Sequence, residues 1–300
     1  MSTSSPVLRL PEWARKGNPL SPEARPLRVL LREQRLVTVC EEARCPNLPD
    51  CFSRGTATFM LLGDRCTRRC GYCSISTAKP LPPDAEEPSR IAETVLRLRL
   101  RYVVLTAVAR DDLFDGGAAH FAQTVRAVRD LCRGVQVEVL TPDFKGDEAA
   151  LAAVLAEAPD VFNHNIETVP RLFPHVRAQG DYTRSLDVLR AVKRLRPGQA
   201  TKSGLMVGLG ETDAEILDVL RDLRAQDVDI VTLGQYLRPT REHVPVDRYV
   251  TPEAFETLAA RAREMGFPTV YSGVFVRSSF NAEEVAGALH GGPGPGLPPV

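Results

Sequence analysis

The sequence predicts an α/β fold, a partial (βα)6 TIM-like barrel, from two observations. From residue 56 onward, short apolar stretches alternate with polar-capped amphipathic helical stretches, at the spacing of βα units. The chain has 300 residues, of which 43% are hydrophobic, enough for one large core. Parallel strands joined by helices require right-handed connections, which curl six units into a barrel or an open doubly wound sheet. We favour the partial barrel.

The elements of the barrel follow in order along the chain. Six strands are predicted, at 56–62, 102–106, 135–140, 161–166, 204–207 and 229–233. Six helices are predicted, at 90–100, 118–131, 148–156, 185–195, 214–224 and 252–265. Two helix starts are well marked, because Thr212 and Glu215 form a capping-box pattern and Thr251 precedes a first-turn proline.

The two ends of the chain are expected to lie outside this barrel. Residues 1 to about 35 carry five prolines, too many for a continuous helix, which predicts an extended arm anchored by Trp13. We assign 1–51 to the N-terminal arm and a cysteine loop, and 52–269 to the barrel. We assign 270–300 to a C-terminal extension that ends in a Gly- and Pro-rich, disordered tail.

The overall composition excludes several classes of protein. Lys plus Arg equals Asp plus Glu, 38 against 38, so no global charge predicts binding to nucleic acid or to a membrane. No apolar run approaches the roughly 18 residues of a membrane span, and no signal or transit peptide is evident. Seven cysteines, an odd number, do not suit a disulfide framework. These features predict a protein of the reducing cytoplasm.

Six cysteines lie within 34 residues, in two sets of three. Cys40, Cys45 and Cys51 have the spacing C-x4-C-x5-C, whereas Cys66, Cys70 and Cys73 have C-x3-C-x2-C. Thiolates at short spacing select zinc, copper(I) or iron-sulfur clusters, and a structural zinc site normally takes four protein ligands. Three thiolates on a 4Fe-4S cluster leave one iron open. A zinc knuckle that borrows a histidine is the alternative, although no histidine lies within the stretch.

The second cysteine set, with Tyr72 before its last cysteine, resembles the signature of the radical S-adenosylmethionine superfamily. The resemblance implies that the open iron binds S-adenosylmethionine and passes an electron to it. Tyr72 is then expected to contact the cofactor.

Polar residues at the strand ends are expected to complete this site, because barrel chemistry occurs at the carboxyl ends of the strands. A zwitterionic ligand with a ribose needs cationic, anionic and amide partners. We select Thr106, Asn163, Glu167 and Lys202 as cofactor contacts; alternatively, such residues only satisfy loop backbone. The full set at this face is Thr106, Arg110, Asp111, Asp112, Glu138, Thr141, Asn163, His164, Asn165, Glu167, Lys202, Ser203 and Gln235.

Two further features are weaker. Gly208 and Gly210 resemble half of a dinucleotide fingerprint without its third glycine, and predict a turn or a close approach of backbone to an adenosyl group. Cys132, at the end of an amphipathic helix, is expected to be buried and structural.

Several blocks together resemble the lipoyl synthase family, from about residue 30 to 285. These are the two cysteine sets, Asp111-Asp-Leu, Asp115-Gly-Gly-Ala118, Phe162-Asn-His-Asn-Ile-Glu167, Lys202-Ser-Gly-Leu-Met-Val-Gly-Leu-Gly-Glu-Thr212, Leu233-Gly-Gln-Tyr-Leu237 and Arg277-Ser-Ser279. The resemblance implies an auxiliary 4Fe-4S cluster on Cys40, Cys45 and Cys51, with Ser278 as its fourth ligand. A serine oxygen is a poor iron ligand beside thiolates, which suits a cluster that is dismantled for its sulfide. The family usually has Tyr-His after the serines, whereas this chain has Phe280 and Asn281.

The resemblance also implies the reaction and its partners. Sulfur is inserted at carbons 6 and 8 of an octanoyl chain on a carrier lysine, with the auxiliary cluster as donor. These carbons have no acidic proton and no leaving group, so a radical is required. The implied carriers are the glycine cleavage H protein and the acyltransferase subunits of 2-oxoacid dehydrogenases. A ferredoxin or flavodoxin is the expected electron donor, and an iron-sulfur carrier the expected source of clusters.

Three other functions remain open from the residues. A biotin synthase or a tRNA methylthiotransferase would share the second cysteine motif, but no appended basic domain for tRNA is present. A non-enzymatic zinc or iron-sulfur module would leave the polar strand ends unexplained.

Overall fold

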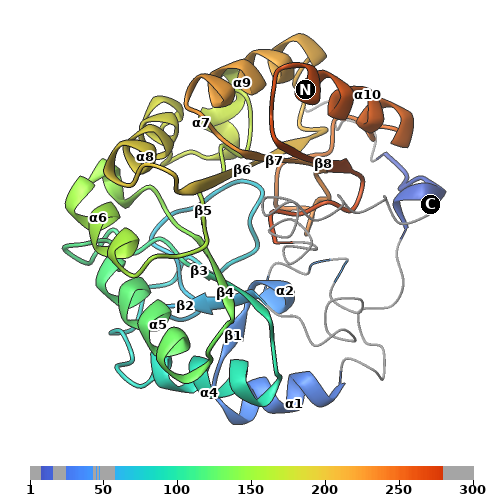
Figure 1. The fold of residues 1–300 in the computed structure, drawn as a ribbon. Coiled ribbons are helices and arrows are strands. Elements are labelled where there is room, and N and C mark those ends of the chain that lie inside the picture. Colours follow the sequence, from blue (N-terminus) through green and yellow to red (C-terminus); the bar gives the residue numbers. More distant parts are fainter. Residues whose placement is uncertain (1–7, 16–24, 43–44, 46, 48–57, 280–300) are drawn as a thin grey trace.

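A single curved sheet of eight strands forms the body of the protein (Figure 1). The computed structural model describes residues 8–15, 25–42, 45, 47 and 58–279. Strand β1 is antiparallel to β2, and β2 to β8 run parallel in sequence order. The strands are β1 (Val37–Thr38), β2 (Thr58–Leu61), β3 (Tyr102–Ala107), β4 (Gln136–Leu140), β5 (Val161–Asn163), β6 (Ala200–Val207), β7 (Ile230–Gln235) and β8 (Thr269–Gly273).

Six helices connect the parallel strands and lie on the outer side of the sheet (Figure 1). They are α4 (Glu87–Arg97), α5 (Ala118–Leu131), α6 (Glu148–Ala156), α8 (Tyr182–Leu195), α9 (Asp213–Ala225) and α10 (Pro252–Glu264). Each predicted strand and helix corresponds to one of these elements, with ends that differ by a few residues. The α/β fold and the partial barrel of six βα units are therefore confirmed.

Two local predictions differ from the structure. The stretch after α10 forms β8, an additional strand parallel to β7, and the predicted boundary at residue 269 coincides with its first residue. The predicted arm is not extended throughout, because α1 (Arg25–Glu33) is helical. Pro26 lies in the first turn of α1, where a missing N–H costs no helical hydrogen bond, so this proline does not prevent the helix.

The predicted helix caps form as expected. The N–H of Glu215 donates to the Thr212 hydroxyl at 3.2 Å, and the N–H of Thr212 donates to the Glu215 carboxylate at 2.8 Å. The Thr251 hydroxyl accepts from the N–H of Ala254 at 3.3 Å. These caps satisfy backbone donors that the first helical turn leaves free, and so they fix where α9 and α10 begin.

The apolar core lies between the sheet and the helices. Phe59, Phe121 and Val139 are fully buried in the half formed around β2 to β5, and Cys132 packs there with its thiol 3.4 Å from the carbonyl of Ala92. The structural role predicted for Cys132 is confirmed. The other half surrounds β6 to β8, where Trp13 packs against Tyr249, as expected of an anchor for the arm. None of the described helices is long and apolar enough to cross a bilayer.

Candidate active site

A cavity of about 490 Å³ lies at the carboxyl ends of the parallel strands. Most of the residues selected from the sequence meet in its wall. These are Cys40 and Cys45 of the first cysteine set, Cys66, Cys70 and Cys73 of the second, and Tyr72, Thr106, Glu167 and Ser278. Cys51 lies outside the described residues. Two segments more than 200 residues apart in the sequence thus reach one cavity.

The second cysteine set lies on the loop after β2, and backbone hydrogen bonds fix the ends of this loop. Leu62 leaves β2 with a φ of 66°, and its N–H donates to Glu87 at 2.8 Å, which His120 also contacts at 2.6 Å. The N–H of Cys66 donates to the carbonyl of Ser76 at 2.8 Å and closes the loop. The three thiols therefore lie on a loop whose two ends are fixed by hydrogen bonds.

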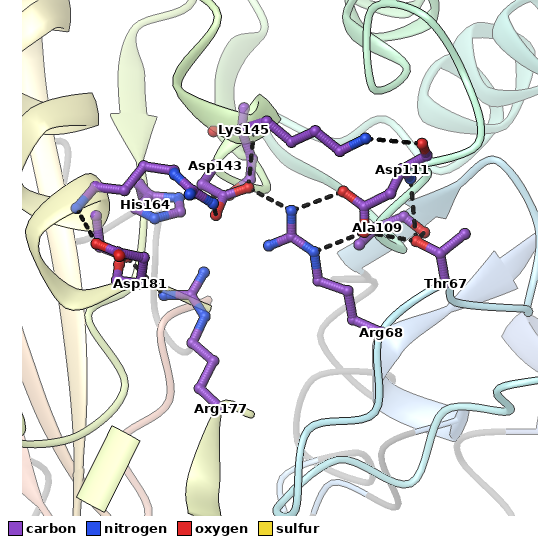
Figure 2. Close-up of polar contacts among 12 residues, drawn as sticks. Thr67, Arg68, Ala109, Asp111, Asp143, Lys145, His164, Arg177 and Asp181 are labelled. Carbon is purple, nitrogen blue, oxygen red and sulfur yellow. Dashed lines mark hydrogen bonds and ion pairs between the residues drawn. The ribbon is translucent and has the colours of Figure 1, made fainter. Parts of the chain in front are cut away.

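Arg68, between the first two cysteines of this set, joins the loops that follow three strands (Figure 2). Its guanidinium donates to both carboxylate oxygens of Asp111 at 2.8 Å and to Asp143 at 2.6 Å. Burial raises the pKa of Asp143, but the hydrogen bonds from Arg68 outweigh it and hold the pKa well below its usual range. Lys145 donates to the carbonyl of Asp111 at 2.9 Å. This network fixes the cysteine loop against the barrel.

The sulfur of Cys66 already has two hydrogen-bond donors. The backbone N–H groups of Arg68 and Ala109 point to it at 3.4 and 3.3 Å. The Thr67 hydroxyl donates to the carbonyl of Ala109 at 2.9 Å and fixes the second donor. Such N–H···S bonds stabilise negative charge on cluster sulfurs.

The chemistry of the donor set fits an iron-sulfur cluster on this loop. Burial raises the pKa of Cys70 to about 11 and that of Cys73 to about 12, so both are thiols at neutral pH without a metal. A cationic centre ionises such thiols and releases their protons. Three thiols on one loop at the wall of the open cavity equal in number the protein ligands of a cluster with one iron left for a ligand.

A second loop covers the cysteine loop from the side of β7. The Nε2–H of His243 donates to the carbonyl of Cys73 at 3.0 Å, and its Nδ1 accepts from the Thr240 hydroxyl at 2.8 Å. The N–H of Val244 donates to the carbonyl of Gly71 at 2.9 Å. Val244 and the backbone of His175 pack so closely around Gly71 that a larger residue has no room there. A Cβ at position 71 would lie 2.7 Å from Val244 and 2.6 Å from the carbonyl oxygen of His175.

Glu167 and Arg177 form the polar side of the cavity. Glu167 has a φ of 70° and accepts from the Asn165 amide at 3.0 Å. Burial raises the pKa of Glu167, an effect that Arg177 opposes. Arg177 donates to the carbonyl of Asn165 at 2.9 Å and to the Ser185 hydroxyl at 3.0 Å, and it also lines the cavity. A half-buried carboxylate near a guanidinium suits a ligand that carries both hydroxyls and a carboxylate.

Ser278 lines the same cavity as the second cysteine set. Its hydroxyl donates to Asn165 Oδ1 at 2.8 Å, and Gly204 provides the space, because a Cβ there would lie 2.6 Å from Ser278 Oγ. The amide of Asn47 donates to the carbonyl of Phe275 at 2.7 Å. This contact joins the first cysteine segment to the segment that carries Ser278, so both are present at the same part of the cavity.

Asn163 and Lys202 do not line the cavity; they are buried in the barrel interior with Glu138. Lys202 Nζ lies 3.0 and 3.1 Å from the two Glu138 oxygens, and the Asn163 amide donates to Glu138 at 2.7 Å. Direct contact of Asn163 and Lys202 with a cofactor stays a prediction. Thr106 does line the cavity, although its hydroxyl donates to the carbonyl of Leu140 at 2.8 Å.

The glycine pair after β6 does not form an open anion site. The Glu211 carboxylate accepts from the N–H of Gly208 at 2.6 Å and from that of Leu209 at 2.8 Å. The backbone donors that would bind a phosphate are therefore occupied by the protein itself. The interpretation of this segment as a turn is the one that the geometry supports.

Sequence reasoning missed two residues of the cavity, Arg177 and Arg68, and did not select a third, Asn165, as a cofactor contact. Arg177 lies outside the predicted strand ends, just after the short helix α7 (Phe173–Val176), where no pattern marks it. Arg68 lies inside the cysteine motif and was not singled out. Asn165 was among the polar residues of the strand ends, but Asn163 was preferred, although the sequence Asn-His-Asn offers two amides.

Comparison with known proteins agrees with this geometry. The family model of the Radical SAM superfamily matches residues 60–223. The chain is 54% identical over 283 residues to the lipoyl synthase of Methylococcus capsulatus, which covers 94% of this chain and 88% of that protein. It is 53% identical to that of Thiobacillus denitrificans, covering 95% and 92%. The crystal structure of HydG, a maturase of the FeFe hydrogenase, has a similar fold, with a TM-score of 0.57 at 14% identity over 92% of this chain and 72% of that one.

Proposed function

The chain belongs to the lipoyl synthase family of radical S-adenosylmethionine enzymes, and from this premise we propose how its cavity inserts sulfur into an octanoyl chain borne by a lipoyl carrier protein. The enzyme class implies two 4Fe-4S clusters and S-adenosylmethionine. The observation that carries the assignment is the single cavity lined by thiols of both cysteine sets and by Ser278.

Each cysteine set has its own role in this proposal. Cys66, Cys70 and Cys73 would hold the first cluster, which would supply the electron for reductive cleavage of S-adenosylmethionine. Cys40, Cys45 and Cys51, with Ser278, would hold the auxiliary cluster, which would supply sulfide for carbons 6 and 8. The contact between Asn47 and Phe275 supports the pairing of the N-terminal segment, 1–51, with the C-terminal extension, 270–300, around the barrel of 52–269.

S-adenosylmethionine recognition is proposed for the polar side of the cavity. Glu167 and Asn165 offer acceptors and an amide to the ribose hydroxyls, and Arg177 offers its guanidinium to the carboxylate. Tyr72, which lies next to Glu167, and Thr106, which also lines the cavity, contact the cofactor as well. Asn163 and Lys202 stay proposed contacts, although both are bonded to the buried Glu138 and neither lines the cavity.

The remaining work of the protein is positioning and the exclusion of water. Hydrogen bonds hold the cysteine loop on three sides, from Arg68, from His243 and from the Cys66 backbone. The octanoyl chain has no polar group near carbons 6 and 8, so the apolar wall formed by Met60, Leu140 and Leu205 suits it. Exclusion of water by the bound substrate would also protect reactive species from side reactions.

Partners and location follow from the family and from the chemistry. The carriers are the glycine cleavage H protein and the acyltransferase subunits of 2-oxoacid dehydrogenases. A ferredoxin or flavodoxin reduces the first cluster, and an iron-sulfur carrier reloads the second. We place the protein in the cytoplasm, where thiols stay reduced. No role with nucleic acid or a membrane is proposed.

Mass spectrometry of an octanoyl-lysine peptide tests the proposal. The reconstituted protein is mixed with S-adenosylmethionine and a strong reductant under anaerobic conditions for one turnover. Conversion of the peptide to its lipoyl form is expected, with two molecules of 5'-deoxyadenosine per product. Formation of 5'-deoxyadenosine without any change in the peptide would keep the radical chemistry but reject the octanoyl substrate.

A further inference from the structure

Phe114 is the most exposed large apolar side chain among the described residues, at 104% relative exposure, against 62% for the next, Leu81. It lies in the loop between β3 and α5, at the carboxyl ends of the strands, where the cavity lies. A fully exposed aromatic ring adds no burial free energy to the isolated protein. Its position next to the cavity therefore suggests that a partner covers it.

The loop that presents Phe114 is held by hydrogen bonds on both sides of it. The Arg110 guanidinium donates to both oxygens of Asp112 at 2.9 Å. Asp115 accepts from the N–H groups of Gly117 at 2.9 Å and Ala119 at 2.7 Å. Because the loop is already ordered, a partner that buries Phe114 pays little conformational entropy.

A small hollow beside Phe114 is continuous with the wall of the cavity. Its lining includes Leu113, Phe144 and Lys145 together with Arg68, Ala109 and Pro142, and the last three also line the cavity. Phe144 and Lys145 have φ values of 44° and 55°, a backbone conformation that is sparsely populated for residues with side chains. Strain of this kind concentrates at binding sites.

Lys145 adds a charge to the hollow. Its Nζ donates to the carbonyl of Asp111 at 2.9 Å, as Figure 2 shows, and no carboxylate among the described residues lies within ion-pair distance of it. The amine is exposed and its other two donors are available to a partner. The hollow therefore offers an aromatic ring and a cation side by side.

We propose that Phe114 and Lys145 form the docking point for the octanoyl-bearing carrier domain. This inference rests on the proposed function, in which the substrate arm is attached to a protein that must stop close to the cavity mouth. The carrier is expected to cover Phe114 with an apolar side chain and to place a carboxylate against Lys145, next to its octanoyl-lysine. A rigid aromatic residue with a charged neighbour is typical of an interface hot spot.

Comparison of two substrates tests the proposal in the reconstituted enzyme. We expect Phe114→Ser to lower kcat/KM at least ten-fold for an octanoylated carrier domain while the value for an octanoyl-lysine peptide stays unchanged. Lys145→Gln keeps a donor for the Asp111 carbonyl, and its effect on the carrier should shrink as salt is raised. Leu131→Ser is the matched control, because Leu131 is 44% exposed at the other end of α5 and should alter neither substrate.

Anisotropy of a labelled octanoyl carrier domain gives a readout that does not depend on turnover. Weaker binding by Phe114→Ser, with wild-type affinity for Leu131→Ser, is the expected result. Equal losses for carrier and peptide, or no loss for the carrier, would overturn the docking assignment. Failure of the proposed function is distinguishable, because the wild-type enzyme would then convert neither substrate.

Discussion

The Arg68 guanidinium binds the Asp111 carboxylate through two parallel hydrogen bonds of 2.8 Å and reaches Asp143 with a third bond. This arrangement joins the loops after β2, β3 and β4, which lie apart in sequence (Figure 2). Arg is suited to this role because its planar fork matches a carboxylate with two donors, whereas a lysine offers only a point charge. The cysteine loop thus depends on one buried cation.

Arg68→Gln should destabilise the cluster-free protein by at most about 3 to 5 kcal/mol, because the buried Asp143 would lose its nearer cation and keep only the Arg184 guanidinium at 3.5 Å. Chemical denaturation measures this loss, and the iron content after reconstitution should fall in parallel. Arg68→Lys should recover part of the stability but little of the iron, since a lysine cannot bind Asp111 with two donors. Arg69→Gln is the control, because Arg69 is exposed in the same loop and should change stability by no more than about 0.5 kcal/mol. Equal stability of the Arg68 and Arg69 variants would contradict this role.

Gly204→Ala should displace Ser278, because the added Cβ would meet its hydroxyl and also crowd Asn165 and Thr232 of β7. The added Cβ would lie 2.6 Å from Ser278 Oγ and 2.8 Å from Asn165 Oδ1, so at least one of them must move. We expect both Gly204→Ala and Ser278→Ala to retain less of the auxiliary cluster and to keep the other cluster. Iron and sulfide analysis with electron paramagnetic resonance separates the two signals. A full iron content in Ser278→Ala would rule out its role as a ligand.

The sequence predicted the barrel well because local rules decide it. The caps at Thr212 and Thr251 and the alternation of apolar and amphipathic stretches each depend on a few neighbouring residues. Helix α1 was missed because a proline was taken as a helix breaker, although it stands in the first turn, where proline is tolerated. Strand β8 was missed because its apolar run was assigned to the extension beyond the barrel.

The site was predicted less completely than the fold, for a different physical reason. The cysteine sets are recognisable because their spacing is short. Asn163 is the last residue of β5 and lies in the barrel interior, whereas Asn165 lies two residues beyond the strand, so the exact end of the strand decides which amide lines the cavity. Arg177 comes from a loop that tertiary packing brings to Glu167, and no local pattern encodes that contact.

Because of His164, the free energy of unfolding should decrease as the pH falls below about 6.5. Burial, and then Arg177, lower the pKa of His164 to about 3, while its Nδ1–H donates to the carbonyl of Thr141 at 2.9 Å. Between pH 3 and the usual value near 6.5, the unfolded chain binds a proton that the folded protein does not, so stability falls as pH decreases. The slope approaches about 1.4 kcal/mol per pH unit.

Denaturant unfolding of the cluster-free protein between pH 5 and 7 measures this effect. His164→Asn should flatten the dependence, because an amide can donate to the Thr141 carbonyl without titrating. His175→Asn is the control, since His175 is exposed and its variant should keep the wild-type slope. An unchanged slope in His164→Asn would assign the pH dependence to other groups.

The Lys202→Met variant tests whether Lys202 only stabilises the buried Glu138 in the barrel interior or also contacts the cofactor. The substitution would leave the Glu138 carboxylate fully buried without a cation, which should cost about 3 to 5 kcal/mol in urea unfolding. The double variant Glu138→Gln with Lys202→Met should recover a large part of this loss, because it removes the unpaired charge. The affinity of the reconstituted double variant for S-adenosylmethionine then decides the remaining question. Affinity near the wild-type value would show that Lys202 acts through Glu138 alone, whereas a ten-fold loss with restored stability would show that its amine reaches the ligand.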